Sequence, residues 1–108
     1  MQQNIYLDNN ATTKVDDAVL AEMLPYLSQF YGNPSSMHTF GGQVGKAVRK
    51  ARSQVAALLG AQDTEIIFTS CGTEGDNAAI RAALTAQPNK RHIITTQVEH
   101  PAVLNLCK

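Results

Sequence analysis

Two patterns of apolar residues alternate along the chain. Short continuous apolar runs, which are typical of buried strands, occupy residues 5–8 (IYLD), 65–70 (EIIFTS) and 92–97 (HIITTQ). The segments between them carry apolar residues at helical spacing, which predicts amphipathic helices. The second half of the chain therefore has the order strand, helix, strand, helix. This order predicts parallel strands joined by right-handed helical connections, that is, an α/β fold.

The first half of the chain predicts two helices separated by a loop. Asp16 or Asp17 is a suitable N-cap for the first helix, and Pro25 within it is expected to kink the helix or restart it. The next segment, residues 31–42 (YGNPSSMHTFGG), is rich in Gly, Pro and Ser and predicts a loop. A longer helix follows, and Gly60 suits the left-handed position that often ends a helix.

The second half predicts two further helices. Residues 73–87 (TEGDNAAIRAALTAQ) have helical spacing, and Pro88 ends this helix. Pro101 lies at the first position of the last helix, where the missing N–H costs no hydrogen bond. Each of these helices follows directly on a predicted strand. Their N-termini therefore lie at one edge of the predicted sheet, where α/β proteins usually bind ligands.

Composition narrows the classes of function. The chain has 108 residues, enough for one domain at most, and its formal net charge of zero argues against nucleic-acid or membrane-surface binding driven by bulk charge. No apolar window reaches the length of a transmembrane helix, and the N-terminus lacks the features of a signal peptide. The two cysteines, Cys71 and Cys107, form no disulfide framework, which favours a reducing, cytoplasmic location. Scattered histidines without ligand spacing argue against a metal site.

The corner between the predicted strand 65–70 and the next helix is the first candidate site. Its sequence, TSCGT, places Gly72 and Thr73 where the first backbone N–H groups of the helix lack intrahelical partners. Small residues, a hydroxyl group and the positive end of the helix dipole suit a bound phosphate. The acidic residues that follow, Glu74 and Asp76, favour a ligand held mainly by backbone N–H groups and the Thr hydroxyl. The alternative is a plain strand-to-helix turn with Thr73 as N-cap.

The second candidate is His100, in the segment VEHPAV just past the strand 92–97. It is expected at the same edge of the sheet as Thr73. A histidine there can stack on a flat ring or transfer protons near neutral pH. The alternative is a structural or solvent-facing histidine.

Four segments in this order resemble the cysteine desulfurases, pyridoxal-phosphate enzymes of aminotransferase class V with fold type I. They are YLDNNATT, YGNPSSMH, IIFTSCGTEGDN and VEHPAV, and together they cover nearly the whole chain. Among these enzymes, the combination is most similar to the nitrogen-fixation type, which supplies sulfur for iron–sulfur clusters. The resemblance implies the N-terminal part of a mostly parallel sheet with flanking helices, incomplete in this chain. Residues 1–60 would form an N-terminal helical arm, and residues 61–108 would begin the cofactor-binding region.

The resemblance also implies roles for individual residues. Gly72 and Thr73 match the positions that bind the phosphate of pyridoxal 5'-phosphate. His100 matches the histidine that stacks over the pyridine ring and acts as an acid or base. Residues 9–13 and the loop around Asn33 match segments near the active site or the dimer interface, without firm roles for single residues.

The activity that the resemblance implies is the removal of sulfur from L-cysteine, which gives L-alanine and an enzyme persulfide. An iron–sulfur scaffold protein would accept the sulfur, and the parent enzyme would be a homodimer. In the family the Schiff-base Lys and the nucleophilic Cys follow the region present here, and Cys71 is not that nucleophile. We therefore expect these 108 residues alone to be inactive and poorly ordered.

Three alternatives remain open from the sequence. The parent enzyme could be a selenocysteine lyase or another class V enzyme. The chain could be a non-catalytic remnant that pairs with a full-length desulfurase subunit. It could also be an unrelated small phosphate-binding α/β module.

Overall fold

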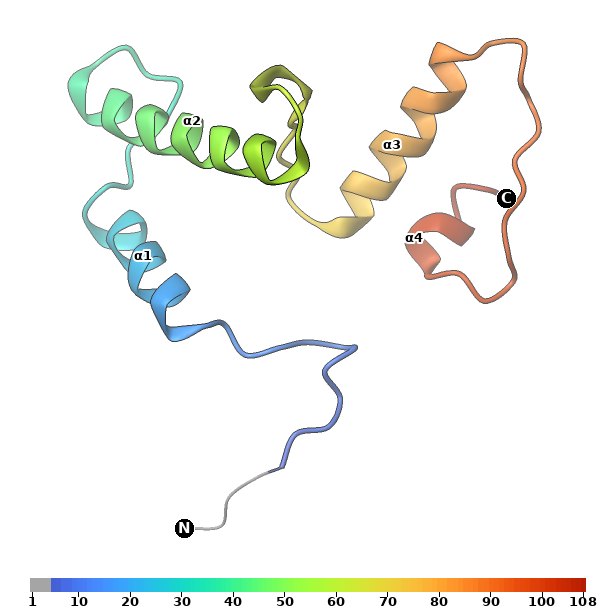
Figure 1. The fold of residues 1–108 in the computed structure, drawn as a ribbon, viewed down its shortest axis with the longest axis horizontal. Coiled ribbons are helices and arrows are strands. Elements are labelled where there is room, and N and C mark those ends of the chain that lie inside the picture. The colour runs from blue at the N-terminus through green and yellow to red at the C-terminus, as the bar shows by residue number, and fades with distance from the viewer. Residues whose placement is uncertain (1–4) are drawn as a thin grey trace. The chain divides into compact units, whose positions relative to one another are not determined.

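The computed structural model describes residues 5–108, which divide into two compact units. The first unit runs to Asp63 and the second covers Thr64–Lys108. The helices are α1 (Asp17–Ser28), α2 (Thr39–Leu59), α3 (Gly72–Ala86) and α4 (Pro101–Leu104), and a 3-10 turn, η1, covers Asp63–Glu65 (Figure 1). The described residues contain no strand.

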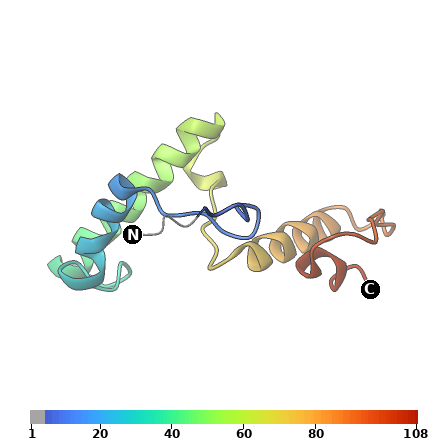
Figure 2. The same ribbon diagram turned by 90° about the horizontal axis from the view of Figure 1, so that it is seen from below.

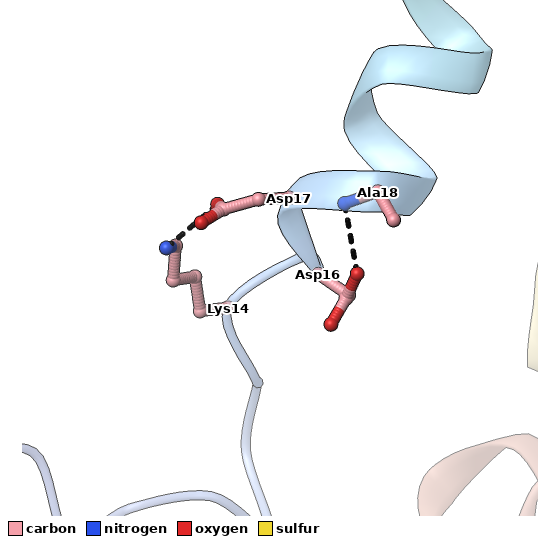
Figure 3. Close-up of polar contacts among 4 residues, drawn as sticks. All are labelled: Lys14, Asp16, Asp17 and Ala18. Carbon is pink, nitrogen blue, oxygen red and sulfur yellow. Dashed lines mark hydrogen bonds and ion pairs between the residues drawn. The ribbon is translucent and has the colours of Figure 1, made fainter.

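The start of α1 is fixed by local polar contacts (Figure 3). The backbone N–H of Ala18 donates to Oδ1 of Asp16 at 2.8 Å, which confirms the predicted N-cap at Asp16. Lys14 forms an ion pair with Asp17, again at 2.8 Å. Both of these charged side chains are largely exposed, so the ion pair contributes little stability.

Pro25 lies inside α1, and the helix does not restart after it. The helix runs on to Ser28, and the Pro25 carbonyl accepts hydrogen bonds from the N–H groups of Gln29 and Phe30, both at 2.8 Å. Because Pro25 is so near the helix end, its missing N–H removes one hydrogen bond from the last turns without dividing the helix.

The loop was predicted to cover residues 31–42, but helix α2 already begins at Thr39. His38 is its N-cap, with Nδ1 accepting a hydrogen bond from the N–H of Gly41 at 3.1 Å. A Cβ on Gly41 would collide with the carbonyl oxygen of Asn33, and one on Gly45 would lie 2.9 Å from that of Pro34. Both glycines are therefore helical residues against which the preceding loop packs, and Gly41 does not belong to the loop as predicted.

The other helix ends agree closely with the sequence pattern. Gly60 has φ 67°, ψ 28°, and its N–H bonds back to α2, which confirms it as the left-handed C-cap. Helix α3 covers Gly72–Ala86 against a predicted 73–87, and Pro101 is the first residue of α4. Cys71, rather than Thr73, occupies the N-cap position of α3, so the interpretation of Thr73 as N-cap was wrong.

The predicted strands at residues 5–8, 65–70 and 92–97 do not form, so an α/β arrangement is not realised within residues 5–108. A parallel strand obtains its hydrogen bonds only from neighbouring strands, and such sheets are stable when helices cover both faces. The second unit, which holds the segments 65–70 and 92–97, has α3 and α4 as its α-helices. These two helices lie side by side in both views (Figure 1, Figure 2).

The apolar residues of these segments consequently have no core. Among the described residues, only Ala56 and Ala102 are buried hydrophobics. Leu7, Ile67 and Ile94 are each more than four-fifths exposed, at 86%, 81% and 88%. The apolar runs that predicted buried strands are thus present in the sequence but uncovered in the structure.

Candidate functional site

A pocket of about 390 Å³ lies between α3 and α4, within the second unit. It brings together two of the predicted site residues, Thr73 and His100. Gly72 does not line it, but precedes Thr73 directly as the first residue of α3. The other residues of the lining are Asn77, Arg81, Pro101, Ala102, Asn105 and Leu106.

The N-terminus of α3 presents backbone donors that have no acceptor within the helix. The first hydrogen bond of the helix joins the N–H of Gly75 to the carbonyl of Cys71 at 3.1 Å. The N–H groups of Gly72 and Thr73 therefore have no acceptor within the helix. A Cβ built on Gly72 meets no atom within 4 Å, so there is open space in front of this turn. The geometry admits an anion close to the backbone.

The Glu74 carboxylate is held away from the pocket. Its Oε2 accepts hydrogen bonds from the Ser70 hydroxyl and from the Ser70 backbone N–H, each at 2.6 Å. These two bonds, the hydroxyl first, lower the pKa of Glu74. The arrangement resembles a capping box shifted by one residue. The negative charge of Glu74 therefore lies on the Ser70 side of the turn.

Cys71 has an exposed thiol at the same turn. The backbone N–H of Glu74 and the Ser70 hydroxyl, which lies 3.8 Å from Sγ, lower the pKa of the Cys71 thiol. Cys71 does not line the pocket.

His100 is the N-cap of α4. Its Nδ1 accepts a hydrogen bond from the N–H of Ala102 at 3.2 Å. The acceptor role of Nδ1 assigns the ring proton of the neutral imidazole to Nε2. The ring lines the pocket and keeps Nε2 for proton transfer or for contact with a ligand.

Asn77, to which the sequence pattern assigns no role, is hydrogen-bonded both to Thr73 and to the turn that carries His100. Its Nδ2 donates to the carbonyl of Thr73 at 2.9 Å and to the carbonyl of Ala102 at 3.0 Å. The available signal was spacing, because Thr73, Asn77 and Arg81 recur every four residues and share one face of α3. That face lines the pocket.

Two other segments singled out by the sequence lie in the first unit. In residues 9–13 the N–H of Ala11 donates to the Asp8 carbonyl at 3.1 Å, which forms a turn. Asn33 accepts a hydrogen bond at Oδ1 from the N–H of Ser35 at 2.9 Å, an Asx turn ahead of α2. Each segment is thus held by a hydrogen bond between residues close in the sequence.

Residues 5–108 hold no cluster of three or more His, Cys, Asp and Glu side chains that could bind a metal ion. In the same part of the chain, no helix combines the length and apolar character needed to cross a membrane.

Comparisons with known proteins agree on one family. The family model described as aminotransferase class-V matches residues 5–108. A cysteine desulfurase of Trichormus azollae is 81% identical over 104 residues, covering 96% of this chain and 26% of that protein. The cysteine desulfurase NifS of Azotobacter vinelandii is 61% identical over 105 residues, with the same coverage.

A solved structure has a closely similar backbone. It is titled "NIFS-like protein", and it matches with a TM-score of 0.85 and 46% sequence identity over 96% of this chain. The match covers 29% of that structure. The chain thus spans about a quarter of the length of the curated relatives that it matches (26%).

Proposed function

The chain belongs to the aminotransferase class-V family, and from this premise we propose that it supplies the phosphate seat and the ring-facing histidine of a pyridoxal-phosphate-dependent cysteine desulfurase. The observation that carries the proposal is the joint position of Thr73 and His100 in one pocket. The backbone match to the NIFS-like structure supports an N-terminal part of the same fold. The division into an arm, residues 1–60, and the start of the cofactor-binding region, residues 61–108, belongs to the same proposal.

The N-terminal turn of α3 fits the phosphate group of the cofactor. The N–H groups of Gly72 and Thr73 lack acceptors within the helix, and the space in front of Gly72 is open. The hydroxyl of Thr73 adds a third donor at the pocket wall. Because the Glu74 carboxylate is bound to Ser70, it does not occupy this space. We propose that Gly72 and Thr73 bind the phosphate.

His100 fits the role of the histidine that faces the cofactor ring. Its Nδ1 is engaged by the N–H of Ala102, which fixes the tilt of the imidazole against α4. The ring then presents a face to a flat ligand in the pocket, and Nε2 holds or accepts the proton that moves during the reaction. When bound, pyridoxal phosphate supplies an electron sink for the substrate carbon.

The chain provides only part of a desulfurase site. No lysine is among the residues that line this pocket, and the thiol of Cys71 lies outside it. We propose that the cofactor-binding Lys and the sulfur-accepting Cys belong to the part of the relatives' sequences that this match does not cover. The proposal further includes L-cysteine as substrate and L-alanine as product. It also includes an iron–sulfur scaffold protein as sulfur acceptor and a homodimeric enzyme.

A cytoplasmic location is part of the proposal and is supported by the cysteines. Cys71 and Cys107 are both free thiols, as expected in a reducing compartment.

The second candidate is a non-catalytic chain that pairs with a desulfurase subunit. It is favoured by the exposed apolar residues of the missing strands, such as Ile67 and Ile94, which a partner sheet would cover.

The test is cofactor binding by the protein at its native length. Wild type and Thr73→Ala are titrated with pyridoxal phosphate, and binding is followed by visible absorbance. Loss of the Thr73 hydroxyl, which contacts a charged phosphate, is expected to weaken binding about tenfold. A wild-type protein that binds no pyridoxal phosphate would refute the enzyme proposal and leave the pairing candidate.

A further inference from the structure

We propose that Asn77 is a positioning residue that holds the phosphate seat and His100 in fixed relation to each other. The inference rests on the proposed function for the identity of the ligand. The geometry on which it stands belongs to the chain itself. Asn77 belongs neither to the phosphate seat, Gly72 and Thr73, nor to the turn that His100 caps. It therefore acts on both through its hydrogen bonds to Thr73 and Ala102.

Both amide hydrogens of Asn77 are used, and they point to different elements. One bond reaches the Thr73 carbonyl in the first turn of α3, at 2.9 Å. The other reaches the Ala102 carbonyl in α4, at 3.0 Å and 25 residues along the chain. Since both acceptors are carbonyl oxygens, the amide nitrogen, and not the amide oxygen, must face them. A bond to Thr73 alone would be ordinary back-bonding within a helix, whereas the pair ties α3 to α4.

Ala102 passes this constraint to His100. Its carbonyl accepts from Asn77, and its N–H donates to Nδ1 of His100 at 3.2 Å. Ala102 is also one of the two buried hydrophobic residues among those described, with 7% of its surface exposed. The series Thr73, Asn77, Ala102, His100 is therefore continuous, and each step is a hydrogen bond.

The chemical requirement at position 77 is strict. A side chain of this length must donate two hydrogen bonds from one atom, which Asn does and the isosteric Asp does not. A carboxylate there would face two carbonyl oxygens and repel both. Because helix α4 has only four residues, it has few contacts of its own with which to keep His100 in place.

The experiment uses the protein at its native length, with Asn77→Asp as the test variant and Asn89→Asp as the matched control. Asn89 lies in the exposed turn after α3 and outside the pocket, so the control adds the same charge elsewhere in the unit. The readouts are the Kd for pyridoxal phosphate, the circular dichroism of the saturated cofactor band, and amide hydrogen exchange of residues 98–107 without cofactor.

We expect Asn77→Asp to raise the Kd about tenfold or more, since two hydrogen bonds are lost, and to change the cofactor circular dichroism. Exchange in residues 98–107 should accelerate, while Asn89→Asp leaves all three readouts as in wild type. A merely structural role would lower thermal stability and leave the circular dichroism of the saturated cofactor unchanged. If Asn77→Asp fails to fold, Asn77→Gln replaces it, because it keeps both donors at a displaced position and should alter the same band.

A wild-type Kd and an unchanged cofactor band in the folded variant would overturn the proposal. Cofactor binding by wild type distinguishes a failure of this proposal from a failure of the proposed function. If wild type binds no pyridoxal phosphate, the proposed function fails, and hydrogen exchange alone decides on Asn77. Faster exchange in residues 98–107 then supports the link between α3 and α4, and unchanged exchange refutes it.

Discussion

The imidazole Nδ1 of His100 accepts a hydrogen bond from the backbone N–H of Ala102 at 3.2 Å, so the same ring that lines the pocket also caps α4. One side chain thus combines an observed function, the cap, with a proposed one in the reaction. The cap fixes the first turn of α4, and the remaining ring nitrogen, Nε2, is available for chemistry.

Substitution of His100 can separate these functions. Asn is a good N-cap, so His100→Asn is expected to keep α4 while it removes the ring. In the protein at native length, we expect kcat for alanine release from L-cysteine to fall by about 10²–10⁴-fold, the range for loss of a general acid or base. His100→Ala should lose the cap as well, at a cost of about 1 kcal/mol. Wild-type kcat in His100→Asn would exclude a chemical role for the ring.

Gly72 and Gly60 should respond differently to substitution by Ala. The Cβ in Gly72→Ala meets no atom of the chain, and φ at this position is not positive, so folding should be unaffected. The same methyl group would stand where the phosphate is proposed to bind, and we expect the Kd for pyridoxal phosphate to rise about tenfold or more. Gly60→Ala should instead cost about 1–2 kcal/mol of stability, because φ is 67°.

Gly42→Ala is the matched control for Gly72→Ala. A Cβ at Gly42 also meets open space, and the residue lies in α2 of the first unit. Stability is measured by urea unfolding and affinity by titration with the cofactor. A Gly72→Ala protein that binds pyridoxal phosphate as tightly as Gly42→Ala would contradict the position of the phosphate seat.

The thiol of Cys71 should react at lower pH than an ordinary cysteine. The N–H of Glu74 and then the Ser70 hydroxyl stabilise the thiolate and so lower the pKa of Cys71. A lowered pKa means that the thiolate appears earlier as pH rises, and alkylation by iodoacetamide follows the thiolate. The pH–rate curve for Cys71, followed by peptide mass spectrometry, should have its midpoint below that of a cysteine in an unstructured peptide. Ser70→Ala should move the midpoint upward, and an unmoved midpoint would exclude the hydroxyl as a cause.

The helix ends could be predicted from the sequence because their causes are local. The Asp16 cap, the left-handed Gly60 and the first-turn Pro101 each depend on residues within one turn. The start of α2 was missed for the opposite reason. Gly41 and Gly42 have the composition of a loop, but Gly41 is a helical residue on which Asn33 packs, which is a tertiary effect.

The candidate site was predictable in part. The positions of Thr73 and His100 follow from where helices start after apolar segments, and the pocket that they share does not require the strands to be paired. The link through Asn77 was not predictable, since its second acceptor lies 25 residues away. The strands themselves were not realised because their hydrogen bonds and apolar contacts must come from other strands, which the described residues do not supply.

That dependence gives a prediction for residues 1–108 produced alone. With Ala56 and Ala102 as the buried hydrophobic residues of the described part, burial cannot offset the conformational entropy lost on folding. We expect no cooperative thermal transition, strong binding of an apolar dye, and no alanine release from L-cysteine with added pyridoxal phosphate. The cysteine desulfurase NifS of Azotobacter vinelandii, assayed in parallel, is the positive control. A sharp melt of monomeric 1–108 would mean that the exposed apolar runs, Ile67 and Ile94 among them, find a core within these residues after all.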